Sequence, residues 1–335
     1  MESTYLLNNI GKKIFVFSCC IPVKGSNRGA IYDLQRETIE FVPNSMIDFL
    51  HFINSKDVAG LIEVFEQKYD TKIVREYINF LIEKEFIFFS KSNNFPNLNL
   101  FHTNEDNSRI EFMNLCVSQN TIENLIAMVK AIEWLGVKRL HLNFSNVDSV
   151  THFKTILDKL RKSRIVNLSI SLPFKAFSSN LSFEDERIKS VYIYESPTKK
   201  IENVNYRLNY FFLTKKMTEL FEQNVNFDLI AVNTKSFSLA QQYNTGLYKT
   251  ILVLDDGNVK FDYNEKINYG NLFDRRSLKI AIKKMSKLWS IHRDQLTPCK
   301  DCELRYGCTI NKVPVKNKDS YKIDCNYIPY TNEIQ

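Results

Sequence analysis

The sequence has few of the residues that break up or loosen a chain. Its 335 residues include nine glycines and eight prolines, and no low-complexity tract is present. Hydrophobic residues make up 44% of the chain, which is enough to bury sizeable cores. These features exclude wholesale disorder, and the length predicts two or three domains.

Long apolar segments are also missing. No run approaches 18 apolar residues, so no membrane span is expected. The opening "MESTYLLNNIGKK" has neither an apolar core nor a small-residue cleavage site, so no signal peptide is expected. These absences predict a cytoplasmic protein. In that reducing compartment, clustered cysteines are more often metal ligands or catalysts than disulfides.

The charge distribution and the absence of common catalytic motifs exclude further classes of protein. The net charge of +7 comes from 45 Lys and Arg against 38 Asp and Glu, scattered rather than gathered on one element, so no nucleic-acid partner is expected. There is no Gly-rich phosphate loop and no Ser-His-Asp signature. The five histidines show no i, i+4 pair that would suggest a metal site; they are His51, His102, His141, His152 and His292.

Residues 1–92 show strand patterns at both ends and helical patterns between them. Strands are expected over "KKIFVFS", "AIYDL", "TIEFV" and "FIFFS", and "QRE" joins the central two as a hairpin. Helical spacing marks "SMIDFLHFI", "DVAGLIEVFEQKYD" and "IVREYINFLIEKEF", the last through Ile73, Tyr77, Phe80, Leu81 and Lys84. This order predicts a winged-helix-like module, followed by the linker "KSNNFPNLN".

Residues 105–248 alternate between strand and helix patterns, which predicts a parallel sheet or a partial (β/α) barrel. One helix is expected to begin at Thr121 and end at Gly136. Strands are expected over "IEFMNLCV", "VKRLHLNF", "IVNLSIS", "SVYIY", "LNYFFL" and "FDLIAV", and further helices over "SVTHFKTILDKLRKS" and "TKKMTELFEQN". The fold class is therefore α/β.

Residues 249–335 contain a hairpin, an amphipathic helix and then a cysteine cluster. "TILVLDDGNVKF" turns at Asp256-Gly257. The cluster C-x2-C-x5-C is followed by one further cysteine, and the four are Cys299, Cys302, Cys308 and Cys325. Four thiolates hold either a zinc ion or an iron–sulfur cluster, and spacing alone favours zinc. His292 is an alternative to Cys325 as the fourth ligand.

The cysteine segment resembles the SPASM domain, the C-terminal auxiliary-cluster domain of radical S-adenosylmethionine peptide maturases. "CKDCELRYGC", "DDGNVKF", "YGNLFD" and the helix ending in Trp289 carry this resemblance. The full domain holds two [4Fe–4S] clusters. Here three of the family's cysteine positions lack cysteine. Phe261 and Asp262 stand at the first upstream position, no cysteine follows Gly270, and Lys312 occupies the position four residues after Cys308. The resemblance therefore implies one [4Fe–4S] cluster, held by the four cysteines named above.

The middle of the chain departs from that family. Radical S-adenosylmethionine enzymes carry C-x3-C-x2-C after the first barrel strand, whereas "EFMNLCVSQN" has Cys116 alone. "FSNVDS" has neither glycine nor proline where the cofactor-binding turn is expected. The resemblance thus implies a degenerate barrel without S-adenosylmethionine, and not a functional radical enzyme. Cys116 itself is expected to be a buried strand residue.

The N-terminal stretch "CCIPVKGSNRGAIYDLQRETIEFVP" resembles the opening of SPASM proteins in grasp-with-spasm peptide systems, which also contain an ATP-grasp ligase and a short precursor peptide. The resemblance implies that residues 1–92 are a winged-helix precursor-recognition element. Such an element binds the peptide as an added strand. The residues expected to bind it are Thr38, Ile39, Glu40, Phe41 and Val42, whose side chains alternate between two faces.

Three function classes remain open. The favoured one is an accessory protein in the maturation of a ribosomally synthesised peptide, which binds the precursor and acts beside an ATP-grasp ligase without independent catalysis. The second is an enzyme that uses its single cluster on the peptide, and the missing cofactor motif counts against it. The third is a zinc-stabilised winged-helix regulator, and the missing basic recognition helix counts against it.

Overall fold

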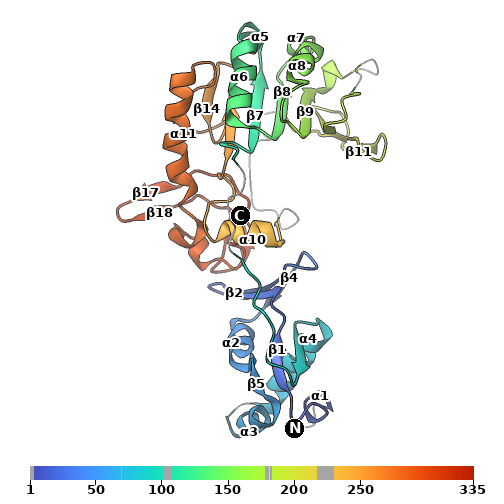
Figure 1. The fold of residues 1–335 in the computed structure, drawn as a ribbon, viewed down its shortest axis with the longest axis vertical. Helices are drawn as coiled ribbons and strands as arrows, with labels where there is room; N and C mark the ends of the chain where they lie inside the picture. Colours follow the sequence, from blue (N-terminus) through green and yellow to red (C-terminus); the bar gives the residue numbers. More distant parts are fainter. Residues whose placement is uncertain (1–3, 69, 101–106, 178–180, 182, 217–229) are drawn as a thin grey trace.

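The computed structural model describes residues 4–68, 70–100, 107–177, 181, 183–216 and 230–335. It has the expected mixed α/β fold, with one nine-stranded sheet and four small sheets in the described part. Figure 1 shows the N-terminal elements at one end, the large sheet at the other, and the C-terminal segment between them. None of the described helices combines the length and the apolar character needed to span a bilayer.

The N-terminal elements form a helical core closed by a small sheet. Strand β1 (Lys13–Val16) pairs antiparallel with β5 (Lys56–Asp57) and β6 (Ile87–Ser90). The helices are α1 (Thr4–Leu7), α2 (Asn44–Ile53), α3 (Val58–Lys68) and α4 (Thr71–Glu83), and all four bury apolar side chains in one core. On α4 the buried stripe is Val74, Ile78 and Leu81, while Ile73 is exposed. The expected helix is confirmed, but its buried face is rotated by one residue.

A second small sheet lies between this helical core and the C-terminal segment. Its antiparallel order is β2 (Cys20–Lys24), β3 (Gly29–Asp33), β4 (Thr38–Val42), so the expected hairpin around "QRE" is confirmed. Strand β3 is buried throughout: Ile31 packs on the helices, while Tyr32 packs on Phe237. A strand covered on both faces reads as a continuous apolar run, as "GAIY" does.

The large sheet has the order β11-β12-β10-β9-β8-β7-β13-β14-β15 and is open in the described residues. Its parallel strands are β7 (Phe112–Val117), β8 (Arg139–Phe144), β9 (Asn167–Pro173), β10 (Ile188–Tyr194), β12 (Asn209–Phe212) and β13 (Thr250–Val253). Antiparallel strands complete both edges, namely β11 (Lys200–Asn203), β14 (Asn258–Lys260) and β15 (Gly270–Asn271). Because β13 joins this sheet, the units expected on either side of residue 248 share one sheet and one core.

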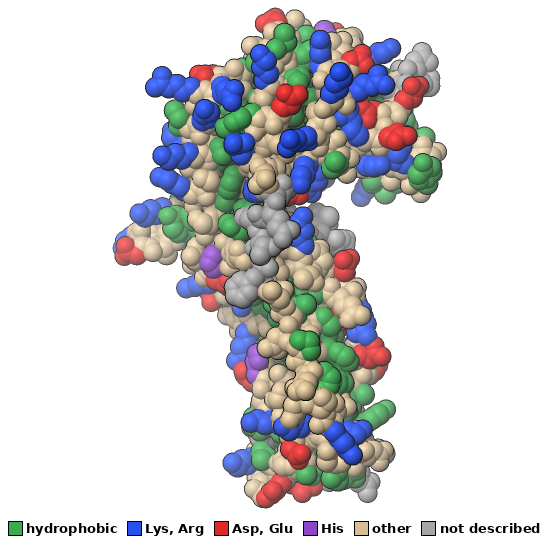
Figure 2. All heavy atoms as spheres, viewed as in Figure 1, with side chains coloured by type: hydrophobic (Ala, Val, Ile, Leu, Met, Phe, Trp, Pro, Cys, Tyr) green, Lys and Arg blue, Asp and Glu red, His purple; other side chains and the backbone are tan. Residues whose placement is uncertain are grey.

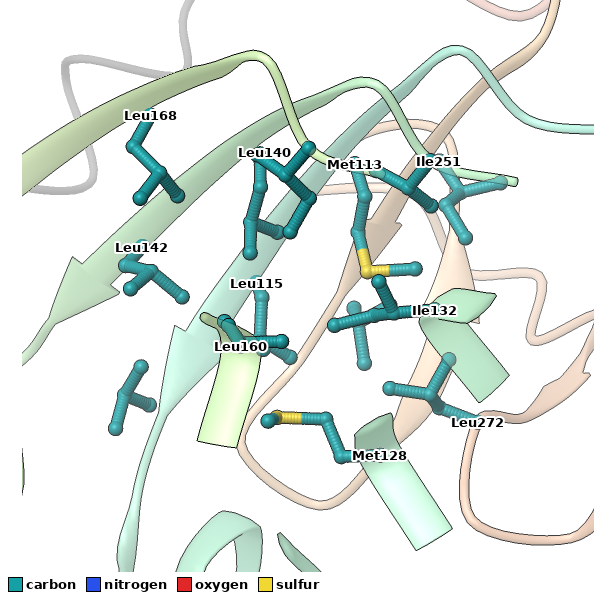
Figure 3. Close-up of a cluster of buried hydrophobic side chains, with 14 of the residues drawn as sticks. Met113, Leu115, Met128, Ile132, Leu140, Leu142, Leu160, Leu168, Ile251 and Leu272 are labelled. Carbon is teal, nitrogen blue, oxygen red and sulfur yellow. The ribbon is translucent and has the colours of Figure 1, made fainter. Parts of the chain in front are cut away.

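Helices α6 (Leu125–Leu135), α8 (Phe153–Leu160) and α11 (Arg275–Trp289) bury apolar side chains in this core. Figure 3 shows part of it, drawn from the sheet and the helices that cover it: Met113, Leu115, Met128, Ile132, Leu140, Leu142, Leu160, Leu168, Ile251 and Leu272. Alternate strand residues point into this layer, which is why the apolar strand patterns were readable in the sequence.

The prediction of one continuous helix beginning at Thr121 is wrong, because the helical segment starts earlier and is interrupted. It begins after Ser118, which forms a capping box with Thr121, and breaks at Asn124 into α5 (Gln119–Glu123) and α6. The Asn124 side chain donates to the backbone oxygen of Asn120 (2.9 Å), a bond that competes with regular helix. The expected end at Gly136 is confirmed, with φ 70°.

The remaining elements are short. They are α7 (Val147–Val150), α10 (Thr234–Ala240), β16 (Leu296–Thr297), β17 (Val315–Asn317), β18 (Ser320–Lys322), β19 (Tyr327–Ile328) and β20 (Glu333–Ile334). The helix expected over "TKKMTELFEQN" lies outside the described residues except for residues 214–216, which are not helical. The first half of the strand expected over "FDLIAV" also lies outside them, and residues 230–232 do not form a strand. The last strands form two small sheets, one of order β16-β18-β17 and one of β19 with β20.

Candidate metal centre

The four expected ligand cysteines line one pocket. The C-x2-C pair spans a 3₁₀ helix, Cys299–Asp301, closed by a bond from Cys302 N to Cys299 O (2.9 Å). Cys308 follows a turn in which its own N–H donates to Leu304 O (3.0 Å). Tight turns of this kind bring residues three to six apart onto one side of the backbone.

Cys325 reaches the same pocket through sheet pairing. Strand β18 runs parallel to β16, and Ile323 N donates to Thr297 O (2.9 Å), which carries the chain back to the 3₁₀ helix. His292, the alternative fourth ligand, does not line this pocket; its Nδ1 lies 3.2 Å from Asp294 Oδ2. The geometry therefore assembles the four-cysteine set, whose role as metal ligands stays a prediction.

The spacing of the sulfurs bears on which metal would fit. Across the described chain, no three of these four sulfurs all lie within 4.8 Å of one another. A tetrahedral zinc site with zinc–sulfur bonds of about 2.3 Å places its thiolates roughly 3.8 Å apart. In a [4Fe–4S] cluster each thiolate binds a different iron, so the sulfurs stand further apart. The four sulfurs are thus not gathered as closely as a tetrahedral zinc site holds them, and the choice between zinc and a [4Fe–4S] cluster stays a prediction.

Burial favours the protonated form of three of these thiols, those of Cys299, Cys302 and Cys325. It raises the pKa of Cys299 to about 11, and it also raises the pKa of Cys302 and Cys325. Two donors already point at sulfur, because Leu304 N lies 3.4 Å from Cys302 Sγ and Arg293 Nη1 lies 3.7 Å from Cys299 Sγ. Such donors stabilise thiolate once a metal has displaced the protons.

Arg293 was not singled out in the sequence, yet it is the largest fully buried side chain beside the pocket, at 1% exposure. Its Nη2 donates to Ile310 O (2.5 Å), and its Nε has no hydrogen-bond partner among the described residues. Burial is the largest single influence on Arg293 and acts to lower its pKa, but the surrounding cysteines Cys308, Cys299 and Cys325 together raise it, so the pKa of Arg293 is raised overall. A buried cation facing four thiols fits a negatively charged metal–thiolate group.

The cysteine segment is docked onto the β2-β3-β4 sheet. The Tyr32 hydroxyl donates to the backbone oxygen of Glu303 (2.8 Å), and Ser26 N donates to Asp301 O (2.7 Å). A Cβ placed on Gly25 would lie 2.9 Å from Glu303 N, so this close approach requires glycine. The turn between β2 and β3 therefore rests directly on the loop that carries Cys302.

Strand β4 is one of the two outer strands of that sheet among the described residues, and β2 is the other. The expected alternation is observed: Val42 belongs to the helical core and Glu40 accepts from Lys84 Nζ (2.7 Å), whereas Ile39 packs toward the C-terminal segment. Phe41 lies on that second face under Arg28, whose Cζ is 3.6 Å from the ring centroid.

The hydrogen bonding of β3 decides where the amides of β4 point. Leu34 N donates to Cys19 O (2.9 Å), so the even-numbered residues of β3 bond to β2. Its odd-numbered residues therefore bond to β4, where Ile31 pairs with Glu40. The N–H of Ile39 consequently points away from β3, toward the outer edge, where an added strand would bond.

Two other cysteine positions have structural explanations. Cys116 is 4% exposed on β7, as expected, and burial raises its pKa to about 12. Cys19, Cys20 and Asp33 bring three potential ligand atoms within 4.8 Å, a grouping that sequence reasoning missed. However, Arg36 Nη1 lies 2.9 Å from Asp33 Oδ2 and already neutralises that carboxylate, so we interpret Asp33 as a hairpin-stabilising residue.

Comparison with known proteins gives weak results. No family model matches the chain, and no curated protein matches it. Among solved structures, the heterocyclase TruD matches with 7% identity and a TM-score of 0.20, covering 45% of this chain and 24% of TruD. The crystal structure of Streptococcus suis SuiB bound to S-adenosylmethionine matches with 10% identity and a TM-score of 0.30, covering 88% of this chain and 94% of SuiB. Both scores are too low to indicate a shared activity.

Proposed function

We propose that this protein is a precursor-binding accessory component of a grasp-with-spasm-type system, in which a ribosomally synthesised peptide is matured by an ATP-grasp ligase. The observation that carries the proposal is the direct contact between its two candidate sites. The sheet that ends in β4 rests on the loop that carries Cys302. One rigid junction would thus hold a bound peptide at a set position relative to the metal centre.

The peptide site is the outer edge of β4, with Thr38, Ile39, Glu40, Phe41 and Val42. An added strand gains affinity from backbone hydrogen bonds and selectivity from alternate side-chain contacts. The outward N–H of Ile39 supports this site. Arg28 stacks on the ring of Phe41 and is paired with Glu303, so this part of the edge presents an aromatic surface and not a free charge to the peptide.

The metal centre is a single [4Fe–4S] cluster on Cys299, Cys302, Cys308 and Cys325. Such a cluster supplies a rigid cross-link and a redox-active group. The chain's own contribution is to bury three of the four thiols, to half-bury that of Cys325, and to direct Leu304 N and Arg293 Nη1 at two of them. We assign the centre a structural role, since no second catalytic constellation accompanies it in the sequence.

Calorimetric titration of the full-length protein with a synthetic peptide, made from the short reading frame beside its gene, tests the proposal. Micromolar binding that is lost in folded Ile39→Pro supports it, because proline removes the outward N–H. Absence of binding, with or without the neighbouring ATP-grasp ligase present, would refute it. Stoichiometric zinc together with tight binding to duplex DNA would instead favour the regulator.

A further inference from the structure

Arg293 stands apart from other buried arginines in this chain because no carboxylate pairs with it among the described residues. Arg187, also largely buried, makes a two-pronged ion pair with Asp185, with Nη2 to Oδ2 at 2.6 Å. Arg305 lines the same pocket as Arg293, and its Nε lies 3.0 Å from Asp294 Oδ1. A guanidinium buried without a counter-charge is strongly destabilising, so the fold needs a negative group next to Arg293.

The groups that face Arg293 are sulfurs and a carbonyl. Nη1 lies 3.7 Å from Cys299 Sγ, Nη2 binds Ile310 O, and Nε is unpartnered within the described chain. A carbonyl satisfies a donor but supplies no net charge. Four thiolates around a zinc ion or a [4Fe–4S] core leave the whole group with net negative charge. The counter-charge of Arg293 is therefore absent until the centre is formed.

We propose that Arg293 is the internal counter-ion of the metal centre, so that metal binding and the buried guanidinium stabilise each other. The inference rests on the metal centre under Proposed function and names a positioning residue that is not a ligand. It also limits the ligand class: the pocket selects an anionic metal–thiolate group and disfavours a neutral or cationic one. By thermodynamic linkage, the free energy by which the bound metal group stabilises the buried Arg293 charge equals the free energy that Arg293 adds to metal binding.

A purely structural arginine would behave differently. If Arg293 served only to bind Ile310 O, its loss would weaken the metal-free and metal-loaded proteins alike, and the stability gained on loading would not change. Removing a counter-ion lowers the stability that the protein gains on metal loading, because the attraction between the guanidinium and the metal–thiolate group exists only in the loaded protein. The gain is therefore the quantity that separates the two roles.

The experiment compares Arg293→Gln, Arg293→Lys and wild type as full-length proteins. Glutamine keeps donors for Ile310 O but loses the charge, whereas lysine keeps the charge. Urea unfolding is measured after chelation and after anaerobic reconstitution with iron and sulfide, and metal affinity is measured with Co²⁺ in competition with a chelator. Arg187→Gln, remote from the pocket with its own carboxylate, is the control.

We expect Arg293→Gln to bind Co²⁺ at least tenfold more weakly than wild type and to gain less stability on reconstitution. Arg293→Lys should retain most of the Co²⁺ affinity and of the stability gain. Arg187→Gln should match wild type in Co²⁺ affinity and in stability gain. The midpoint potential of the reconstituted cluster should become more negative in Arg293→Gln, since a positive charge favours the reduced state. An unchanged stability gain and affinity in Arg293→Gln would overturn the counter-ion role. No gain in wild type itself would instead refute the metal centre.

Discussion

Arg28 Nε lies 2.8 Å from Oε1 of Glu303, and this contact joins residues 275 positions apart in the chain. The Glu303 side chain is completely buried, and the same oxygen also accepts from the Tyr327 hydroxyl (2.5 Å). Because Glu303 follows Cys302 directly, the contact couples the β2-β3-β4 sheet to the candidate metal centre. Loss of the Arg28 cation would leave a buried carboxylate without its ion-pair partner.

We therefore expect Arg28→Ala to lower the free energy of unfolding by about 2–4 kcal/mol, since removing one partner exposes the desolvation cost of the other. Lys24→Ala, which removes an exposed pair with Asp48, should cost under about 1 kcal/mol. Arg28→Ala combined with Glu303→Gln should cost less than the sum of the two single changes. Urea unfolding measures all of them, and equal costs for Arg28→Ala and Lys24→Ala would contradict this account.

The metal prediction concerns composition. Anaerobically purified protein should contain about four irons and four sulfides per chain, as a [4Fe–4S] cluster implies. Cys299→Ala should lose the metal and destabilise the C-terminal segment, because metal binding and folding are linked. Cys116→Ala, at a buried strand position, is the matched control and should keep full metal content. Stoichiometric zinc without acid-labile sulfide would show the metal assignment to be wrong.

We also expect no radical chemistry. Cys116 stands alone where the resemblance implies three cysteines, and Asn146, at the position of the missing glycine turn, caps α7 through a bond from Ser149 N to its Oδ1 (2.8 Å). Incubation with S-adenosylmethionine and a strong reductant should yield no 5′-deoxyadenosine above background. Sustained production that depends on Cys116 would refute this expectation.

Strand β4 provides a pair of proline substitutions with opposite outcomes. Glu40 N points toward β3, so Glu40→Pro should break the sheet and lower the unfolding free energy by about 3 kcal/mol or more. Ile39→Pro removes an outward N–H and should leave the circular dichroism spectrum close to wild type. If Ile39→Pro unfolds the protein and Glu40→Pro does not, the deduced amide directions are reversed.

His141 on β8 predicts a pH dependence of stability. Its Nδ1 and Nε2 lie 2.7 Å from the hydroxyls of Ser169 and Ser171, and burial lowers its pKa to about 4. Below pH 6.5 the unfolded chain binds a proton there that the folded protein does not. Stability should therefore fall by up to about 3 kcal/mol between pH 6.5 and 4. His141→Gln should flatten this part of the profile, and an identical profile would contradict the shift.

The local elements were largely readable from the sequence because apolar spacing reports directly on burial. The period-2 pattern predicted β7 and β8, and the hairpin around "QRE" followed from two strands separated by polar residues. Competing local bonds were harder to read. The break at Asn124 depends on side-chain bonding that hydrophobic spacing does not reveal, and α4 carries two adjacent apolar stripes, of which packing selects one.

The candidate site divides in the same way. Four cysteines, three of them within ten residues, indicated from the sequence alone that this segment carries the thiol chemistry of the protein. Tertiary structure alone decided that Cys325 and not His292 reaches the pocket, since the pairing of β18 with β16 sets the path of the chain. It alone also singled out Arg293 among 45 lysines and arginines, because burial of a charge depends on how segments distant in sequence pack around it.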